Sequence, residues 1–129
     1  MPDPNCKIHG CIHMPGFVIE CGYDEKLALA SVGFGWADLV RKGLLAVAGY
    51  GRLVQVKEKY GTLRLYWEGD SGITRGKADV IQHRLDALEA ASGAICEQCG
   101  APGQLVVSGG WYRTACPRCR PAGAKVVSA

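Results

Sequence analysis

The sequence lacks a dominant charge. Of its 129 residues, 15 are lysine or arginine and 12 are aspartate or glutamate, which leaves a formal net charge of +3. Proteins that bind nucleic acids mainly through charge carry a dense basic face, and a balance this even does not predict one. A local basic patch can still exist within a balanced total, so the composition neither requires nor excludes nucleic-acid binding.

Long hydrophobic runs are also missing. A membrane-spanning helix needs roughly 18 or more apolar residues, whereas the longest run here is the glycine-broken "GLLAVAG". The first residues, "MPDPNCKIHG", lack the basic segment and apolar stretch of a secretory signal. We therefore expect no membrane association and an intracellular location. With 48% hydrophobic and 21% charged residues, the composition predicts a folded globular chain of one domain.

Catalytic motifs are absent as well. The chain has only three histidines and contains no G-x-S-x-G, P-loop, H-E-x-x-H or H-x-E pattern. We therefore expect a non-enzymatic protein. An enzyme hypothesis would require an open metal site with only three protein ligands, for which the N-terminal region is the one candidate.

Cysteine, in contrast, is plentiful, with seven residues. Cys96, Cys99, Cys116 and Cys119 follow the pattern C-x2-C-x16-C-x2-C. Two residues between ligands allow a tight turn to direct both thiolates at one ion, and sixteen residues are enough for a hairpin that brings the turns together. This spacing predicts a closed, structural Zn²⁺ site, with a redox dithiol as the weaker alternative.

The N-terminal segment holds a second group of metal-ligand types. It consists of Cys6, His9, Cys11, His13 and Cys21. These residues could bind a second Zn²⁺, but their spacing matches no strong pattern. Ordinary buried cysteines and exposed histidines explain the same residues, and both interpretations stay open.

Hydrophobic periodicity predicts an α+β fold, in which helices pack on a small antiparallel sheet that continues into a C-terminal zinc ribbon with four cysteine ligands. The expected helices span 24–31, 36–50 and 77–92. Alternation predicts two strands within 52–69, joined by a turn at 57–61, and two more at 104–107 and 111–115. We divide the chain into an irregular segment (1–23), a domain (24–120) that includes the ribbon (94–120), and a flexible tail (121–129).

Aromatic and basic residues are interleaved on the predicted strands. If Leu63, Leu65 and Trp67 face the core, the residues between them face solvent. The candidate nucleic-acid or partner-binding residues are Lys57, Lys59, Tyr60, Arg64, Tyr66, Trp111 and Arg113. Such residues can stack on bases and neutralise phosphates, but they are equally common on any half-buried sheet.

Several of these motifs together resemble a group of small zinc-ribbon proteins of unassigned function, encoded by bacteriophages, prophages and some bacterial genomes. The resemblance covers roughly residues 33 to 120. Its elements are Gly35-Trp36, the "KEKYGTLRLY" strand, a helix ending at Ser92, the "CEQCGAPG" knuckle, and the "WYRTACPRC" knuckle. In this group of proteins the last metal ligand is often histidine, whereas in this chain it is Cys119. The cysteine-rich N-terminus is not a feature of the group.

The resemblance implies a zinc-binding accessory protein of a phage or mobile element, located in the cytoplasm of the bacterial host cell. Small proteins of this kind commonly bind a host macromolecule and inhibit or redirect a host defence or regulatory system. A host protein is the first expected partner. The alternative function is a nucleic-acid-binding regulator that uses the hairpin and the ribbon.

Overall fold

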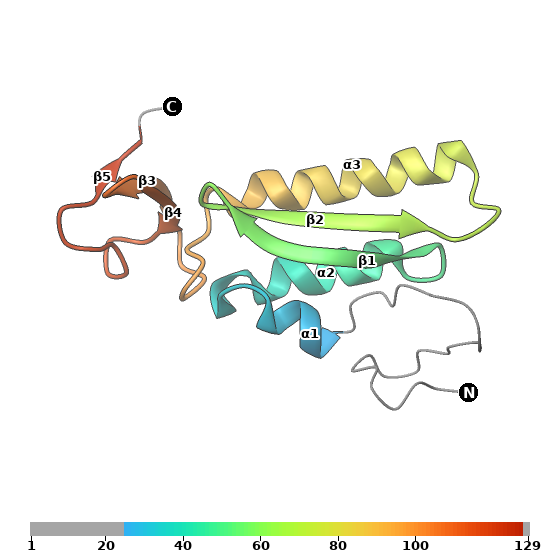
Figure 1. Cartoon of the computed structure of the whole chain (residues 1–129), viewed down its shortest axis with the longest axis horizontal. Helices are drawn as coiled ribbons and strands as arrows, with labels where there is room; N and C mark the ends of the chain where they lie inside the picture. Colours follow the sequence, from blue (N-terminus) through green and yellow to red (C-terminus); the bar gives the residue numbers. More distant parts are fainter. Residues whose placement is uncertain (1–24, 128–129) are drawn as a thin grey trace.

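The structure is a computed structural model that describes residues 25–127. It confirms the α+β class and contains two lobes, which lie side by side in Figure 1. The first lobe contains α1 (Glu25–Ala30), the 3-10 turn η1 (Phe34–Trp36), α2 (Ala37–Val47), β1 (Gly51–Lys59), β2 (Thr62–Gly69) and α3 (Arg75–Ser92). The second lobe contains β3 (Gln104–Ser108), β4 (Trp111–Ala115) and β5 (Lys125–Val126).

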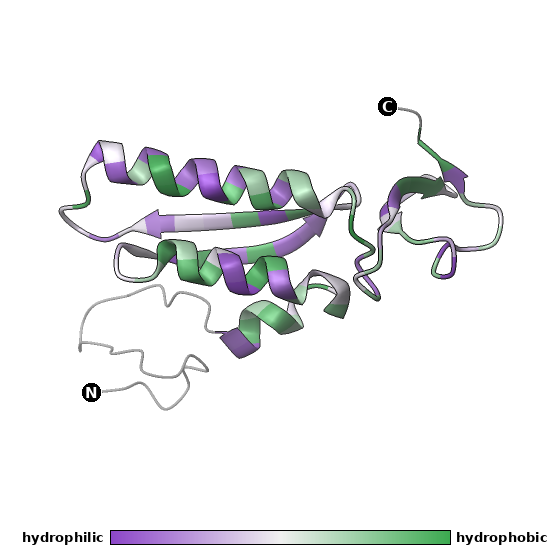
Figure 2. Cartoon of the chain, turned by 180° about the vertical axis from the view of Figure 1, so that it is seen from behind, coloured by the Kyte–Doolittle hydropathy of each residue, from purple (hydrophilic) through white to green (hydrophobic). Residues whose placement is uncertain are grey.

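The first lobe is built on an antiparallel β1–β2 hairpin that packs against α2 and α3. Hydrophobic and hydrophilic segments alternate along both helices, as Figure 2 shows, so that each helix offers one apolar stripe to the core. The buried core residues are Ala28, Trp36, Leu39, Val40, Val47, Leu53, Val56, Leu63, Leu65, Ile81 and Leu85. The core thus lies between the helix pair and one face of the hairpin.

The hairpin turn is tighter than the sequence suggested. We expected a turn over 57–61, but β1 runs to Lys59 and β2 begins at Thr62. Only Tyr60 and Gly61 connect them, with φ angles of 52° and 84°. Positive φ at both central residues is the requirement of a type I′ turn, whose twist matches that of paired strands. The charged residues before the turn are therefore strand residues whose side chains alternate between the two faces.

The ribbon does not continue the first sheet, which corrects our prediction. β1 and β2 form one sheet, and β4, β3 and β5 form another in that order. The free edge of β2 is already taken by α3: the Leu63 N–H donates to Ser92 Oγ at 2.9 Å and the Leu65 N–H donates to Glu89 Oε2 at 2.7 Å. Because these donors are satisfied, the ribbon cannot add to that edge.

The segment after Pro121 is not wholly irregular. Lys125 and Val126 form β5, which pairs with Val107 and Val106 of β3. Val127 N–H donates to the Leu105 carbonyl at 2.8 Å, which extends the pairing by one residue. The expected flexible tail therefore contributes a strand to the ribbon.

Candidate metal centre

The four C-terminal cysteines converge on one point. Their sulfur atoms all lie within 4.8 Å of one another, and the sulfurs of Cys99 and Cys116 are 3.5 Å apart. Tetrahedral zinc at about 2.3 Å from each sulfur places neighbouring sulfurs about 3.8 Å apart, so the set fits one four-coordinate ion. All four are free thiols. The structure therefore favours a metal site over a redox disulfide.

Two turns of similar design supply the ligands. In the first turn, the Gly100 N–H donates to the Cys96 carbonyl at 2.9 Å, and Gly100 has a φ of 83°. In the second turn, the Cys119 N–H donates to the Cys116 carbonyl at 3.1 Å. Gly100 directly follows the second ligand, Cys99, and a residue with a side chain would be strained at this φ.

The thiols ionise unequally because their surroundings differ. Burial opposes ionisation of Cys96, but backbone N–H groups of Cys116, Cys99 and Gln98 outweigh it and lower its pKa to about 6. Its hydrogen-bonded neighbour Cys116 raises the pKa of Cys119 to about 12, with burial adding to the effect. Four clustered thiolates repel one another, so a cation is needed to ionise the whole set. A divalent metal ion supplies that charge.

The first metal-ligand turn also forms the contact between the lobes. Gly35 N–H donates to the Glu97 carbonyl at 2.6 Å, and the Trp36 indole N–H donates to the Ile95 carbonyl at 2.9 Å. Trp36 is fully buried. A Cβ atom at Gly35 would overlap the Cys96 carbonyl oxygen. Gly35 and Trp36 therefore bind η1 directly to the metal-ligand turn.

A second contact joins the hairpin turn to β4. The Thr114 hydroxyl donates to the Gly61 carbonyl at 2.7 Å, and the Thr114 carbonyl accepts from the Glu97 N–H at 3.1 Å. Thr114 is 1% exposed. One residue of β4 thus bonds both to the hairpin and to the metal-ligand turn. The metal centre is therefore part of the joint between the lobes.

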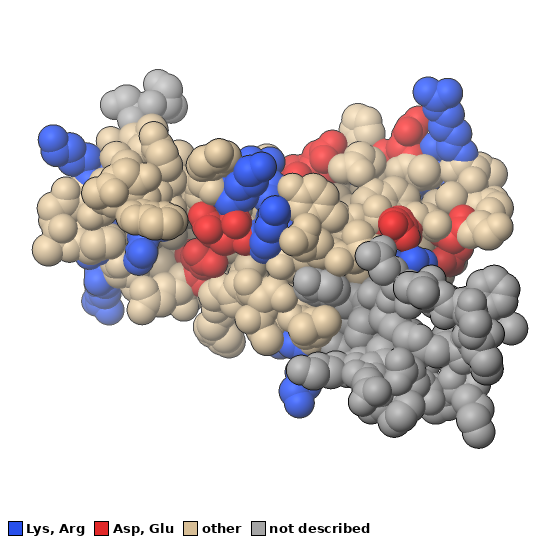
Figure 3. Space-filling view, viewed as in Figure 1, with Lys and Arg blue, Asp and Glu red and all other residues tan. Residues whose placement is uncertain are grey.

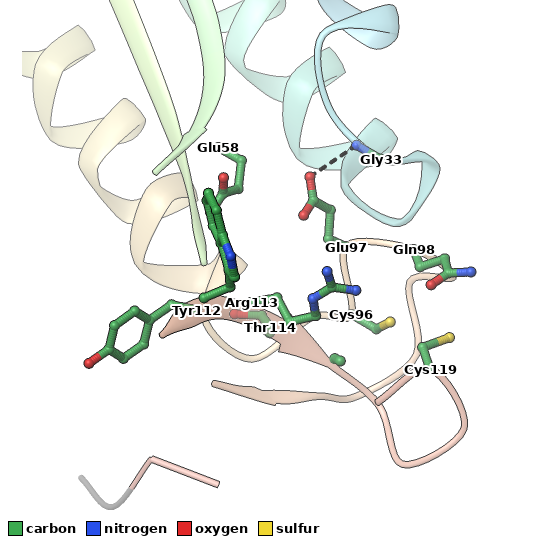
Figure 4. Close-up of a pocket in the computed structure, with 11 residues that line it drawn as sticks. Gly33, Glu58, Cys96, Glu97, Gln98, Tyr112, Arg113, Thr114 and Cys119 are labelled. Atoms are coloured by element: carbon green, nitrogen blue, oxygen red, sulfur yellow. Dashed lines mark hydrogen bonds between the residues drawn. The ribbon is translucent and has the colours of Figure 1, made fainter. Parts of the chain in front are cut away.

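A cleft of about 290 Å³ lies beside this joint. In Figure 4, Glu58 from the hairpin and Glu97 from the metal-ligand turn point toward the same space, with Arg113 below them. Burial raises the pKa of Glu97, and the nearby Glu58 adds to this, while the Gly33 N–H and Arg113 oppose it. The Gly33 N–H donates to Glu97 Oε2 at 3.2 Å. The cleft therefore carries two carboxylates and one guanidinium.

The remaining predicted residues fall into three groups. Lys57, Lys59, Tyr60, Arg64 and Tyr66 lie on the hairpin, whereas Trp111 and Arg113 lie on β4 and line the acidic cleft. Trp111 is 78% exposed and Tyr60 is 68% exposed. The N-terminal candidates Cys6, His9, Cys11, His13 and Cys21 lie outside the described residues. Whether those five bind metal stays a prediction.

The residues that hold the lobes together were not among those predicted from the sequence. Gly33, Glu97 and Thr114 carry no motif that assigns them a role, since their partners are 64, 17 and 53 residues away in the chain. The one usable signal was the motif resemblance, whose segments include Gly35-Trp36, Tyr60-Gly61 and Trp111-x-x-Thr114. In the structure, these segments meet at the joint.

Comparisons with protein-family models, with curated proteins and with solved structures find no match to this chain. Among residues 25–127, no helix is both long enough and apolar enough to span a membrane. The function is therefore inferred from the site and the surfaces described above.

Proposed function

We propose that this chain is a non-enzymatic binding protein, stabilised by one structural Zn²⁺, that acts in the bacterial cytoplasm as an accessory protein of a phage or mobile element. It docks on a host macromolecule and thereby inhibits or redirects a host defence or regulatory system. The phage origin and the host target rest on the motif resemblance. The binding role and the metal rest on the chemistry of the site.

The observation that carries the proposal is the closed donor set at the joint. Four sulfurs fill a tetrahedral zinc shell and leave no position for water or substrate. The same turn holds η1 through Gly35 and Trp36. Zinc at this place fixes the two lobes relative to each other and gives a small protein a rigid surface, which lowers the entropy cost of binding a partner.

The test is purification of the tagged chain from a bacterial host without chelator, with and without nuclease treatment, followed by native mass spectrometry. We expect one zinc ion per chain and a host macromolecule that stays bound through gel filtration. The Cys96→Ser variant should lose both, whereas Arg84→Gln, a change on an exposed residue of α3, should lose neither.

Two results would contradict the proposal. A second zinc bound by only three protein ligands in the 6–21 segment would restore the enzyme hypothesis, because that ion would have an open coordination position. A zinc-loaded chain that retains neither protein nor nucleic acid in any bacterial host tested would remove the binding function itself.

A further inference from the structure

The hairpin has one face that packs on the core and one that does not. Val56 and Leu65 are opposite each other in the register and are both buried against α2 and α3. Side chains alternate along a strand, so the next facing pair, Lys57 and Arg64, lies on the outer face. Among residues 25–127, the helices in extended contact with the hairpin are α2 and α3, which pack on its core face.

The outer face carries more basic than acidic side chains: the register places one acid on it, Glu68, which pairs with Arg52 at 2.8 Å. Lys57, Lys59 and Arg64 have no ion-pair partner within the described part of the chain. Glu58 alternates to the opposite face, where one of its carboxylate oxygens accepts from the Gly61 N–H at 2.6 Å. Figure 3 shows basic and acidic side chains close together where the lobes meet, and the register assigns Glu58 to the cleft side.

The same face presents two tyrosine rings. Tyr66 is 40% exposed, and the Lys57 ammonium lies 5.5 Å from its ring centroid. Tyr60 occupies the turn with a φ of 52°, a conformation that asparagine or glycine adopts with less strain. Its ring is nevertheless 68% exposed, so it contributes little to the core. A strained position that holds an exposed aromatic ring indicates a role in contact with a ligand.

We propose that this outer face binds single-stranded nucleic acid, an inference that rests on the proposed binding function and names its partner. Lys57, Lys59 and Arg64 contact phosphates, and unpaired bases stack on Tyr60 and Tyr66. Tyr66 faces Gln55, five residues before Tyr60. At about 3.3 Å per residue the backbone positions of the two tyrosines are about 17 Å apart along the hairpin, so each ring takes a different base of one strand.

Trp111 and Arg113 are not part of this site. Both line the cleft that contains Glu58 and Glu97, and two carboxylates repel a phosphate backbone. The seven candidate residues therefore form two groups. The five on the hairpin bind single-stranded nucleic acid, and the two on β4, Trp111 and Arg113, do not.

The experiment is fluorescence anisotropy of a labelled oligothymidine of about 12 nucleotides, titrated with the zinc-loaded full chain. Three phosphate contacts predict that affinity falls about 20-fold between about 50 and about 200 mM salt. The duplex form of the same oligonucleotide should bind more weakly, since its bases cannot stack on the tyrosines. Equal or tighter duplex binding would overturn the single-strand assignment.

Three variants separate recognition from folding. Arg64→Gln should weaken binding and make its salt dependence shallower, because one phosphate contact is lost. Arg84→Gln removes the same charge from the helical side, where Arg84 lies beside Lys42 and Leu45, and should bind like the wild type. Tyr60→Asn suits the type I′ turn and should keep the fold while reducing affinity about tenfold.

The outcomes distinguish this inference from the proposed function. No binding at low salt, or equal weakening by Arg64→Gln and Arg84→Gln, overturns the inference. If a host protein nevertheless co-purifies with the chain, the binding function stands and its partner is that protein. If neither oligonucleotide nor host macromolecule binds, the inference and the proposed function fail together.

Discussion

The Thr114 hydroxyl donates a hydrogen bond to the backbone carbonyl of Gly61 at 2.7 Å, across a buried contact between the two lobes. The Tyr60–Gly61 turn of the first lobe therefore has a partner on β4 of the second. A hydrogen bond in a buried contact matters more than one on the surface, because water cannot replace the missing donor.

Replacing Thr114 with valine should lower the free energy of unfolding by about 1–3 kcal/mol, because the Gly61 carbonyl is left buried without a donor. Urea unfolding of the zinc-loaded chain measures the loss. Thr62→Val is the matched control: the Thr62 hydroxyl donates to the Lys59 carbonyl at 3.1 Å in an exposed position. If both variants lose the same free energy of unfolding, the buried hydrogen bond between the lobes contributes no more than the exposed one.

Gly35, in the 3-10 turn η1, should tolerate no side chain. A Cβ atom at Gly35 would overlap the Cys96 carbonyl oxygen, and both groups are backbone, so neither can move without displacing a metal-ligand turn. We expect Gly35→Ala to lower the free energy of unfolding by about 2–4 kcal/mol and to weaken zinc retention.

Gly76 provides the matched control for that experiment. It lies in α3, and nothing is within 4 Å of a Cβ atom built on it. Gly76→Ala should therefore stabilise the chain by about 0.5–1 kcal/mol, since alanine loses less backbone entropy in a helix. If the unfolding temperature shifts in the same direction for both variants, the close contact at Gly35 does not exclude a side chain there.

The sequence predicted the local features well because each depends on neighbouring residues. The helices over 24–31, 36–50 and 77–92 correspond to α1, α2 and α3, and the cysteine spacing located the metal ligands. The separation of the two sheets could not be predicted in this way. It depends on Ser92 and Glu89, which bond to β2 residues 29 and 24 positions away.

The contacts at the joint could not be predicted from the sequence, for the same physical reason. Glu97 lies between two ligands, and its carboxylate bonds to the Gly33 N–H, 64 residues earlier. No local periodicity encodes such a pair. The turn was misplaced because Lys57, Glu58 and Lys59 look like loop residues, although a two-stranded sheet with one exposed face accommodates charged side chains there.

Removing the metal should disorder the ribbon first. Its buried core consists of only Cys96, Val106, Ala115 and Cys116, so little apolar surface remains to hold it once the sulfurs separate. We expect chelation to abolish hydrogen-exchange protection in β3 and β4 while α2 and α3 keep theirs. Adding zinc back should restore the ribbon, and protection that survives chelation would mean that the ribbon folds without the ion.

Zinc binding near pH 7.5 should release fewer than four protons, although four thiolates are needed as ligands. The pKa of Cys96 is about 6, so this thiol is already ionised before the metal arrives, whereas Cys119, with a pKa of about 12, must lose its proton. Calorimetry in buffers of different ionisation enthalpy counts the protons. Because the folded state lowers the pKa of Cys96 from 9.0 to about 6, this thiolate stabilises the metal-free fold fully above about pH 9, and its contribution declines as the pH falls to about 6. Release of four protons would mean that the backbone N–H groups around Cys96 do not stabilise its thiolate in the metal-free chain.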